Sequence, residues 1–138
     1  DAFYQKWKGE RLVVDKWFAL QAGSQLPDTI EQVEALLEHP DFEWTNPNRV
    51  RALLGSFVHG NPLHFHHPSG SGYRLLSRQV LRLDPLNPQV AARMVGAFNP
   101  WRRFDRSHQK LIRNELERIA ATENLSRDVY EIVSRNLG

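Results

Sequence analysis

Apolar residues recur three or four positions apart along most of this chain, which is the spacing of one face of an α-helix. The pattern predicts a short helix before Gly9, a single turn from Pro62, and helices over residues 11–22, 29–38, 47–58, 73–83, 88–98, 105–121 and 127–137. Polar and apolar residues nowhere alternate as they would in a half-buried strand. The predicted fold is therefore all-α, a superhelical or solenoid-like array of about eight short antiparallel helices of the ARM or HEAT kind.

The residues expected to face the core share this helical spacing. They are Val13, Val14, Trp17, Phe18, Leu20, Ile30, Val33, Leu36, Leu37, Val50, Leu53, Leu54, Phe57, Val58, Leu75, Leu76, Val80, Leu83, Ala91, Met94, Val95, Phe98, Leu111, Ile112, Leu116, Ile119, Val129, Ile132, Val133 and Leu137. A chain of 138 residues is long enough to bury one such core. We therefore expect a single domain over residues 1–138.

Helix ends are marked by particular residues. Asn precedes Pro four times, at Asn46-Pro47, Asn61-Pro62, Asn87-Pro88 and Asn99-Pro100. Asn is a favoured N-cap, and Pro is favoured at the first helical position, where no N–H is needed. Asp28 with Glu31 has the spacing of a capping box, Gly23 is a candidate left-handed stop, and Ser126 is placed to cap the last helix.

The composition is that of an ordinary globular chain, with 41% hydrophobic and 25% charged residues and a formal net charge of +2. That charge is too small to indicate nucleic acid or membrane partners. The longest apolar run, Met94 to Phe98, is far short of the roughly 20 residues of a membrane span. The chain has no cysteine, which suits a reducing compartment, and we expect it to be cytoplasmic. It starts at Asp1 without an initiator Met, so we interpret it as a fragment of a longer polypeptide.

Four histidines in the middle of the sequence are the first candidate for chemistry. They are His59, His64, His66 and His67. Neutral imidazole is a common zinc ligand, but no His is followed by Glu, and no carboxylate lies between His59 and Tyr73 to complete a ligand set. Polar loop residues are the favoured interpretation, and we expect no metal site.

Two groups of arginines and a Gly-rich loop are further candidates. Arg74, Arg78 and Arg82 form one stripe, and Arg102, Arg103 and Arg106 form a second cluster. Few aromatic residues interleave with them, so solvated helix faces are favoured over an anion or nucleic-acid surface. The loop Ser69–Gly72 lacks the Walker A spacing and no strand precedes it, so it is interpreted as a turn before a helix.

Several segments carry a family resemblance, in the same order across essentially the whole chain. They are Arg11–Gln21, Asn46–Arg51, Asn61-Pro62 with Phe65-His66, Gly70–Tyr73, Asn87–Arg93 and Leu125–Tyr130. On these segments the chain resembles the C-terminal domain of bacterial aminopeptidase N, a gluzincin zinc aminopeptidase. One departure is Ser69, where relatives often carry Asp.

The resemblance implies a helical superhelix that caps a thermolysin-like catalytic domain and encloses a chamber for peptides. Zinc, its ligands and the general-base Glu would belong to upstream domains, so we expect no catalytic residue, no metal ligand and no cofactor in this fragment, and no hydrolysis by it alone. In the family, a Gln and an Arg on the helix after Asn-Pro reach toward the chamber and shape substrate access. They correspond to Gln89 and Arg93, which by spacing alone are surface residues on one helix face.

The implied partners are the upstream catalytic domain of the same polypeptide and peptide substrates at the chamber, without nucleic acid or membrane. Two alternatives stay open at this point. One is a free-standing helical-repeat module that binds another protein through a concave face. The other is a nucleic-acid binder that uses the arginine stripes, for which binding would depend steeply on salt.

Overall fold

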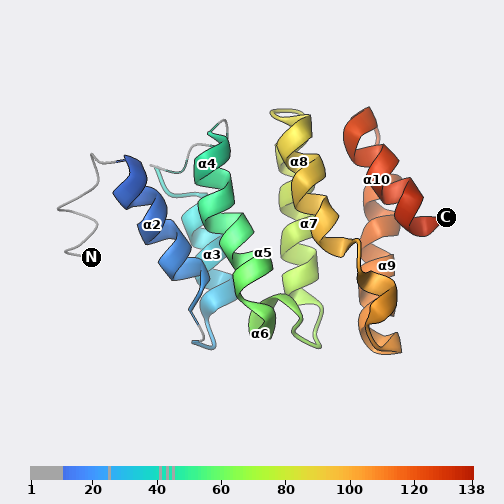
Figure 1. Ribbon diagram of the computed structural model, residues 1–138, viewed down its shortest axis with the longest axis horizontal. Coiled ribbons are helices and arrows are strands. Elements are labelled where there is room, and N and C mark those ends of the chain that lie inside the picture. Colours follow the sequence, from blue (N-terminus) through green and yellow to red (C-terminus); the bar gives the residue numbers. More distant parts are fainter. Residues whose placement is uncertain (1–10, 25, 41, 43, 45) are drawn as a thin grey trace. The chain divides into compact units, whose positions relative to one another are not determined.

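A computed structural model describes residues 11–24, 26–40, 42, 44 and 46–138, with side chains from Asp15 onward. The helix predicted before Gly9 lies outside the described residues. Within them every regular element is helical: α2 (Arg11–Ala22), α3 (Thr29–Leu37), α4 (Pro47–Val50), η1 (Arg51–Gly55), α5 (Ser56–Gly60), α6 (Pro62–Phe65), α7 (Ser71–Leu83), α8 (Pro88–Val95), η2 (Gly96–Phe98), η3 (Trp101–Arg103), α9 (Arg106–Ala120) and α10 (Arg127–Leu137). The all-α prediction is confirmed (Figure 1).

The chain divides into two compact units, Asp1–His64 and Phe65–Gly138. In the first unit, α2 and α3 pack beside a third helical stretch that runs through α4, the π-helical η1 and α5 (Figure 1). Its buried apolar side chains are Trp17, Phe18, Ala22, Val33, Leu37, Phe42, Val50, Leu53, Leu54, Phe57 and Val58. The predicted inward faces of these helices are therefore confirmed in the main, although Ile30 and Leu36 are only half-buried and Leu20, described below, is exposed. The side chains of Val13 and Val14 lie outside those described.

Two polar residues tie the first unit together. Arg49 is 4% exposed, and its Nε donates to Asp15 Oδ1 at 2.5 Å while its guanidinium lies 5.7 Å from the centre of the Phe18 ring. Asn61 is fully buried, and its Nδ2 donates to the backbone oxygens of Ala22 and Ser24, both at 2.8 Å. A buried donor that satisfies helix-end carbonyls is stabilising because an unpaired buried carbonyl would be costly.

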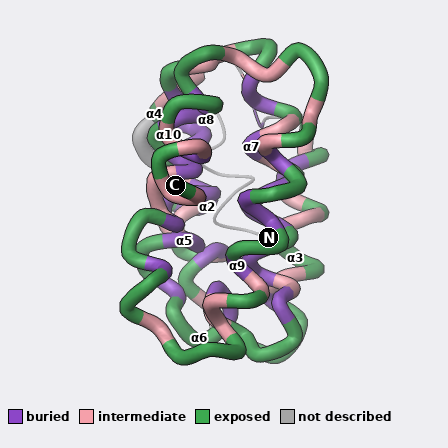
Figure 2. The backbone as a smooth tube through the Cα atoms, turned by 90° about the vertical axis from the view of Figure 1, so that its right-hand side faces the viewer, coloured by how far each residue is buried: buried purple, intermediate pink, exposed green. Residues whose placement is uncertain are grey.

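The second unit contains two helix pairs, in which α7 packs on α8 and α9 packs on α10 (Figure 1). Side-chain caps start three of these helices. Asn87 accepts from Val90 N and Ser126 from Val129 N, as the sequence predicts, and Asp105 accepts from His108 N, which was not predicted. Buried positions recur along the inward side of each helix, and exposed ones along the other (Figure 2).

An aromatic cluster lies at the centre of the second unit. Tyr73 and Phe98 are fully buried, and Phe65 is 2% exposed. The Phe98 ring lies 6.2 Å from that of Phe65 and 5.9 Å from that of Tyr73. Such contacts add to the burial energy because aromatic edges and faces carry opposite partial charges.

Two predicted helix ends are wrong in their details. Gly23 follows α2, but Gly70 is the glycine with positive φ among the described residues. The left-handed stop is unnecessary at Gly23 because Asn61 reaches the Ala22 carbonyl from elsewhere in the unit. Asp28 precedes α3 with φ −93° and ψ 15°, outside the extended region, and its side chain accepts from Gln32 Nε2 rather than from a helix N–H.

Two further predictions are corrected. Asn99 is helical, with φ −53° and ψ −40°, and its Oδ1 accepts from Asn136 Nδ2 at 2.7 Å instead of capping a helix. Leu20 is 68% exposed, although it was expected in the core. It lies two residues after Phe18, about 200° round the helix, so it points away from the buried face.

Candidate functional site

The face of α8 that carries Gln89 and Arg93 is the candidate site. Gln89 and Arg93 are the two exposed residues of this helix. Five of its other residues are buried: Val90, Ala91, Ala92, Met94 and Val95. Because the pair is four residues apart, both side chains lie on one face. The structure thus places both on the surface of α8, as their spacing predicts.

Both side chains are available to a ligand. Neither makes a hydrogen bond or an ion pair with another residue in the part of the chain that the structure describes. The helix beneath them is fixed, because Asn87 Oδ1 caps it at 3.3 Å from Val90 N and it packs against both α7 and α10. A rigid helix that presents two unsatisfied polar side chains suits recognition rather than bond-breaking chemistry.

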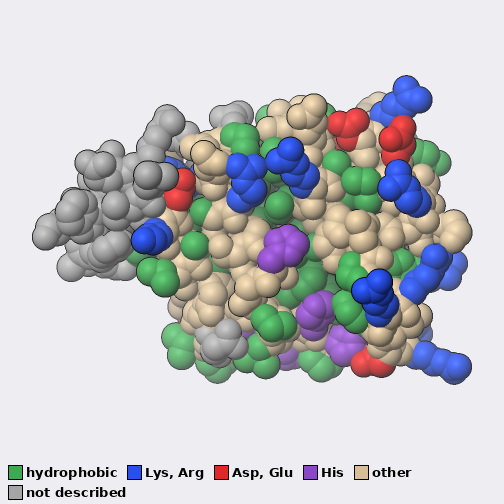
Figure 3. Space-filling model, viewed as in Figure 1, with side chains coloured by type: hydrophobic (Ala, Val, Ile, Leu, Met, Phe, Trp, Pro, Cys, Tyr) green, Lys and Arg blue, Asp and Glu red, His purple; other side chains and the backbone are tan. Residues whose placement is uncertain are grey.

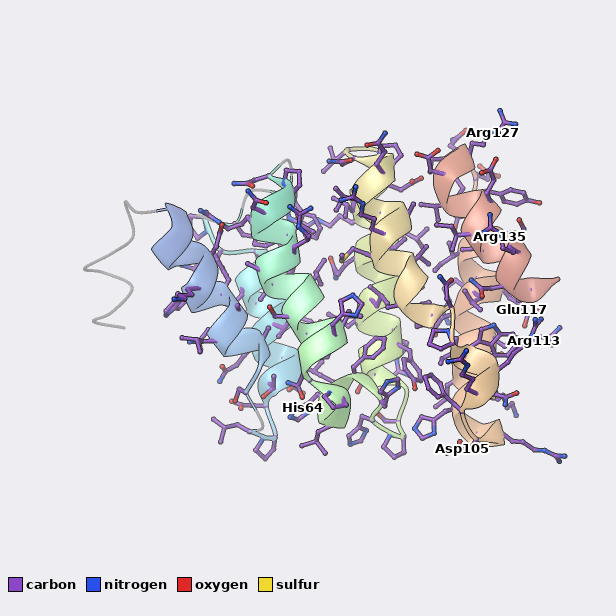
Figure 4. All side chains as sticks on the ribbon, viewed as in Figure 1. His64, Asp105, Arg113, Glu117, Arg127 and Arg135 are labelled. Carbon is purple, nitrogen blue, oxygen red and sulfur yellow. The ribbon has the colours of Figure 1, made fainter. Side chains whose placement is uncertain are left out.

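The four histidines of the middle region do not gather into one site. His59 is exposed, whereas His64, on α6 (Figure 4), is 5% exposed and its Nε2 has no hydrogen-bond partner among the described residues. His66 Nδ1 lies 2.6 Å from the Tyr73 hydroxyl, and His67 Nδ1 lies 2.8 Å from Ser69 Oγ. Across the described residues, no group of three or more His, Cys, Asp or Glu side chains could hold a metal ion. Zinc needs three or four such ligands, so the donors present do not fit it.

A hydrogen-bonded network joins the loop before α7 to the start of α9. His108 Nδ1 donates to Asp105 Oδ1 at 2.8 Å, and His108 Nε2 donates to the His66 backbone oxygen at 2.8 Å. Both acceptors lack a proton, so the geometry favours the doubly protonated imidazolium. Figure 4 shows Asp105 at the start of α9.

The electrostatics of this network follow from its geometry. Hydrogen bonds from the His108 backbone, its ring and Ser107 lower the pKa of Asp105 to about 2. The Asp105 carboxylate raises the pKa of His108, and the His66 carbonyl adds to this effect. Burial lowers the pKa of His66, as does the charge on His108. Burial also raises the pKa of Tyr73 to about 12, so its hydroxyl stays protonated and can donate to the neutral His66 ring.

We expect the contribution of His108 to stability to depend on pH. Because its pKa is raised on folding, the contribution is complete below pH 6.5 and is lost as the pH rises through the folded-state value. His108→Gln should therefore have a lower unfolding free energy than the parent chain. This difference should be larger at about pH 6 than at about pH 9. Urea unfolding at several pH values measures this gap.

Asp105→Asn supplies the control, since the amide can still cap α9 but carries no charge. In the Asp105→Asn background, the difference in unfolding free energy between His and Gln at position 108 should depend less on pH, because only the His66 carbonyl still favours the protonated ring. A gap that widened as the pH rose would contradict the imidazolium assignment.

The turn before α7 is a structural device rather than a phosphate loop. Gly70 has φ +81°, and Ser69 Oγ accepts from Ser71 N at 3.2 Å. The Ser69 hydroxyl thus fixes the turn against the first residue of the helix. Arg74, Arg78 and Arg82 are exposed on α7, as predicted, and Arg74 Nη1 donates to the Ser69 backbone oxygen at 3.0 Å.

The second arginine cluster borders two surface hollows. One of about 480 Å³ is lined by Trp101, Arg102, Arg106, Gln109, Lys110 and Arg113. The other, of about 280 Å³, is lined by Asn99, Pro100, Arg102 and Arg103. The sequence singled out three of these cations but missed Lys110 and Arg113, which follow Arg106 at i+4 and i+7 on the same face of α9.

Comparison with known proteins decides the family. The family model described as "Domain of unknown function (DUF3458_C) ARM repeats" matches residues 1–138. This chain belongs to that family. Aminopeptidase N of Caulobacter vibrioides is 49% identical to this ARM-repeat domain over 138 residues, which is 100% of the chain and 16% of the relative. Aminopeptidase N of Haemophilus influenzae is 46% identical over 135 residues, covering 98% of the chain and 16% of the relative.

A solved structure gives the same result. Aminopeptidase A of Legionella pneumophila, crystallised in complex with aspartic acid, superposes with a TM-score of 0.93 at 38% identity, over 99% of this chain and 16% of that one. The resemblance to the C-terminal helical domain of bacterial aminopeptidase N is confirmed, and with it the ARM-type fold. This ARM-repeat domain spans about one sixth of the length of these relatives. Within its described residues, no helix is both long and apolar enough to cross a membrane.

Proposed function

We propose that this ARM-repeat domain is the C-terminal cap of a zinc aminopeptidase that removes N-terminal residues from peptides. The observation that carries the proposal is the match of the whole chain to a stretch that makes up 16% of aminopeptidases. The remaining length of such an enzyme would hold the zinc, its ligands and the general base. The domain would close one side of the peptide chamber, exclude bulk water and restrict which substrates enter.

The pair on α8 would act on substrate choice. Gln89 can donate to or accept from a peptide backbone, and Arg93 can pair with a carboxylate through two parallel hydrogen bonds. Both lie exposed on a rigid helix and have no partner among the described residues. Neither can activate water at neutral pH in the way that a metal does, so their role is binding and selection.

Three exposed leucines of the first unit leave apolar surface that a neighbouring domain would cover. Leu20, Leu26 and Leu63 of the first unit are 68%, 61% and 56% exposed. Apolar surface of this kind is costly in water, and contact with a catalytic domain would cover it. We propose the upstream catalytic domain as the principal partner of this ARM-repeat domain. That catalytic domain would hold the zinc, and the whole enzyme would lie in the cytoplasm.

Replacing Arg93 with alanine in the full polypeptide should change kcat/KM by about tenfold for peptides that place a carboxylate near it, which corresponds to about 1.4 kcal/mol. Substrates without that group should change by much less, because the lost interaction is absent for them. Steady-state kinetics on matched peptides with a free or an amidated C-terminus measure the difference.

Arg127→Ala is a suitable control because Arg127 is also an exposed arginine on a short helix of the second unit, with one exposed ion pair, to Glu131. It should leave kcat/KM unchanged for both classes of peptide. An equal loss on all substrates in Arg93→Ala would count against a role in selection.

A further inference from the structure

The proposed cap function assigns no role to a cationic surface that is formed by α9 and η3. We define the α9 basic face as Arg102, Arg103, Arg106, Lys110 and Arg113. These residues are all exposed, and together they line the two adjoining hollows, which share Arg102. No carboxylate lines either hollow. Figure 3 shows Lys and Arg side chains gathered at the end of the second unit formed by α9 and α10.

Two exposed arginines of the second unit outside this face are each paired with a nearby acid. Arg118 lies 3.1 Å from Glu115, and Arg127 lies 3.2 Å from Glu131. On the α9 basic face, the side chains of Arg103, Arg106 and Lys110 have no ion pair or hydrogen bond to any residue that the structure describes. Three neighbouring cations are therefore left to solvent or to a ligand.

The two remaining cations of the face are only partly engaged. Arg113 Nε lies 3.6 Å from Glu117 across an exposed pair, in which water and salt screen the attraction (Figure 4). Arg102 stacks on Trp101 with 5.0 Å to the ring centre and donates to backbone oxygens of Asn136 and Gly138. These contacts hold its guanidinium at the rim shared by the two hollows.

The position of Arg106 is unfavourable for α9 itself. Arg106 is the first residue of the helix, no acidic residue lies in its first turn, and the N-terminus of a helix carries a partial positive charge. Asp105, the nearest acid, is bonded to His108. A cation at this position destabilises the helix slightly, so Arg106 does not serve the stability of α9.

The charge and shape of the face determine the kind of partner. Arg106, Lys110 and Arg113 lie at i, i+4 and i+7 and span about 10 Å, the length of about three extended residues. Trp101 is 4% exposed, so no aromatic surface is offered for bases to stack upon, as single-stranded nucleic acids require. No large apolar side chain of the face is exposed, which fits a reversible, salt-sensitive contact rather than a permanent interface.

We propose that the α9 basic face docks a carboxylate-rich segment of another protein, a run of about four or five Asp or Glu residues in extended form. Guanidinium groups match carboxylates bidentately, and the concentration of charge would speed association. The contact is independent of Gln89 and Arg93, which lie on α8.

The test is fluorescence anisotropy of a labelled octaglutamate peptide with the full chain at low and at physiological salt. The peptide should bind at low salt and weaken steeply as the salt rises, because exposed charges are screened within about 8 Å at physiological ionic strength. Arg106→Glu with Lys110→Glu should weaken binding by at least about tenfold, since it replaces attraction with repulsion. Arg106→Ala with Lys110→Ala should give an intermediate loss, and it keeps the test valid if the reversed variant folds poorly.

The matched control is Lys16→Glu with Arg127→Glu, which changes the net charge equally at exposed positions outside the face. It should alter the affinity by less than about threefold. The proposal is overturned if the control variant and Arg106→Glu with Lys110→Glu lose affinity equally, or if octaglutamate does not bind at low salt. It is also overturned if an eight-nucleotide oligonucleotide binds more tightly than octaglutamate and no longer binds to Arg106→Glu with Lys110→Glu.

Discussion

Replacing Phe98 with alanine is expected to lower the free energy of unfolding by about 3–5 kcal/mol. Phe98 is fully buried, and its ring lies beside those of Phe65 and Tyr73 at 6.2 and 5.9 Å. Removing the ring loses its transfer energy and leaves a cavity that the two helix pairs of the second unit cannot close without moving. Urea unfolding followed by circular dichroism measures the change.

Tyr130→Ala is the control for this prediction, because it also deletes an aromatic ring but from a residue that is 51% exposed. It should cost about 1 kcal/mol or less. If the two substitutions had equal effects, the aromatic cluster would not be the core of the second unit.

Gly70→Ala is expected to lower the free energy of unfolding by about 1–3 kcal/mol. Gly70 has φ +81°, where an L side chain is strained, and an added Cβ would lie 3.0 Å from Leu111 Cδ2. The strain would fall on the turn that starts α7 and on its packing against α9. Thermal and urea unfolding report the loss.

Gly60→Ala gives the opposite expectation from the same chemical change. A Cβ at Gly60 would have no atom within 4 Å, and the residue ends α5 with negative φ. Alanine there should be neutral or should stabilise the chain by up to about 1 kcal/mol, since it restricts the unfolded chain. A large loss at Gly60 with none at Gly70 would contradict the backbone conformations described for both.

The helices and their buried faces could be predicted because apolar spacing is a local property. The run from Pro47 to Gly60 shows this well: Val50, Leu53, Leu54, Phe57 and Val58 were all expected inside and all are buried. The π-helical turn within that run was not predicted, because it changes the hydrogen bonding of the backbone without changing which residues are apolar.

Interactions between distant residues could not be predicted. Asn61 was interpreted as a helix cap, and its Nδ2 bonds to residues 37 and 39 positions away depend on how the first unit folds. The bond from His108 to the His66 carbonyl spans 42 positions and left no local signal. The hydrogen bond between His108 and Asp105 does have a local signal in the sequence. Asp followed by His three residues later places a carboxylate and an imidazole on one helix turn.

The candidate site divides in the same way. Helical spacing and the family resemblance together selected Gln89 and Arg93, and the structure places both on the exposed face of α8. Their role in selecting substrates stays a prediction, as does the assignment of residues 1–138 to a single domain, since both depend on the rest of the polypeptide. The extension of the arginine cluster to Lys110 and Arg113 was missed, although their spacing from Arg106 on the predicted helix indicates it.

The most direct test of this account is an assay of the purified chain for alanyl- and leucyl-amide hydrolysis with added zinc, repeated with the upstream catalytic portion supplied in trans. We predict no turnover and no stoichiometric tight zinc for the chain alone, and an altered substrate preference of the catalytic portion when the chain is added. Turnover of an amino-acid amide by the chain alone, with one zinc bound, would contradict the claim that it is a cap without catalytic groups.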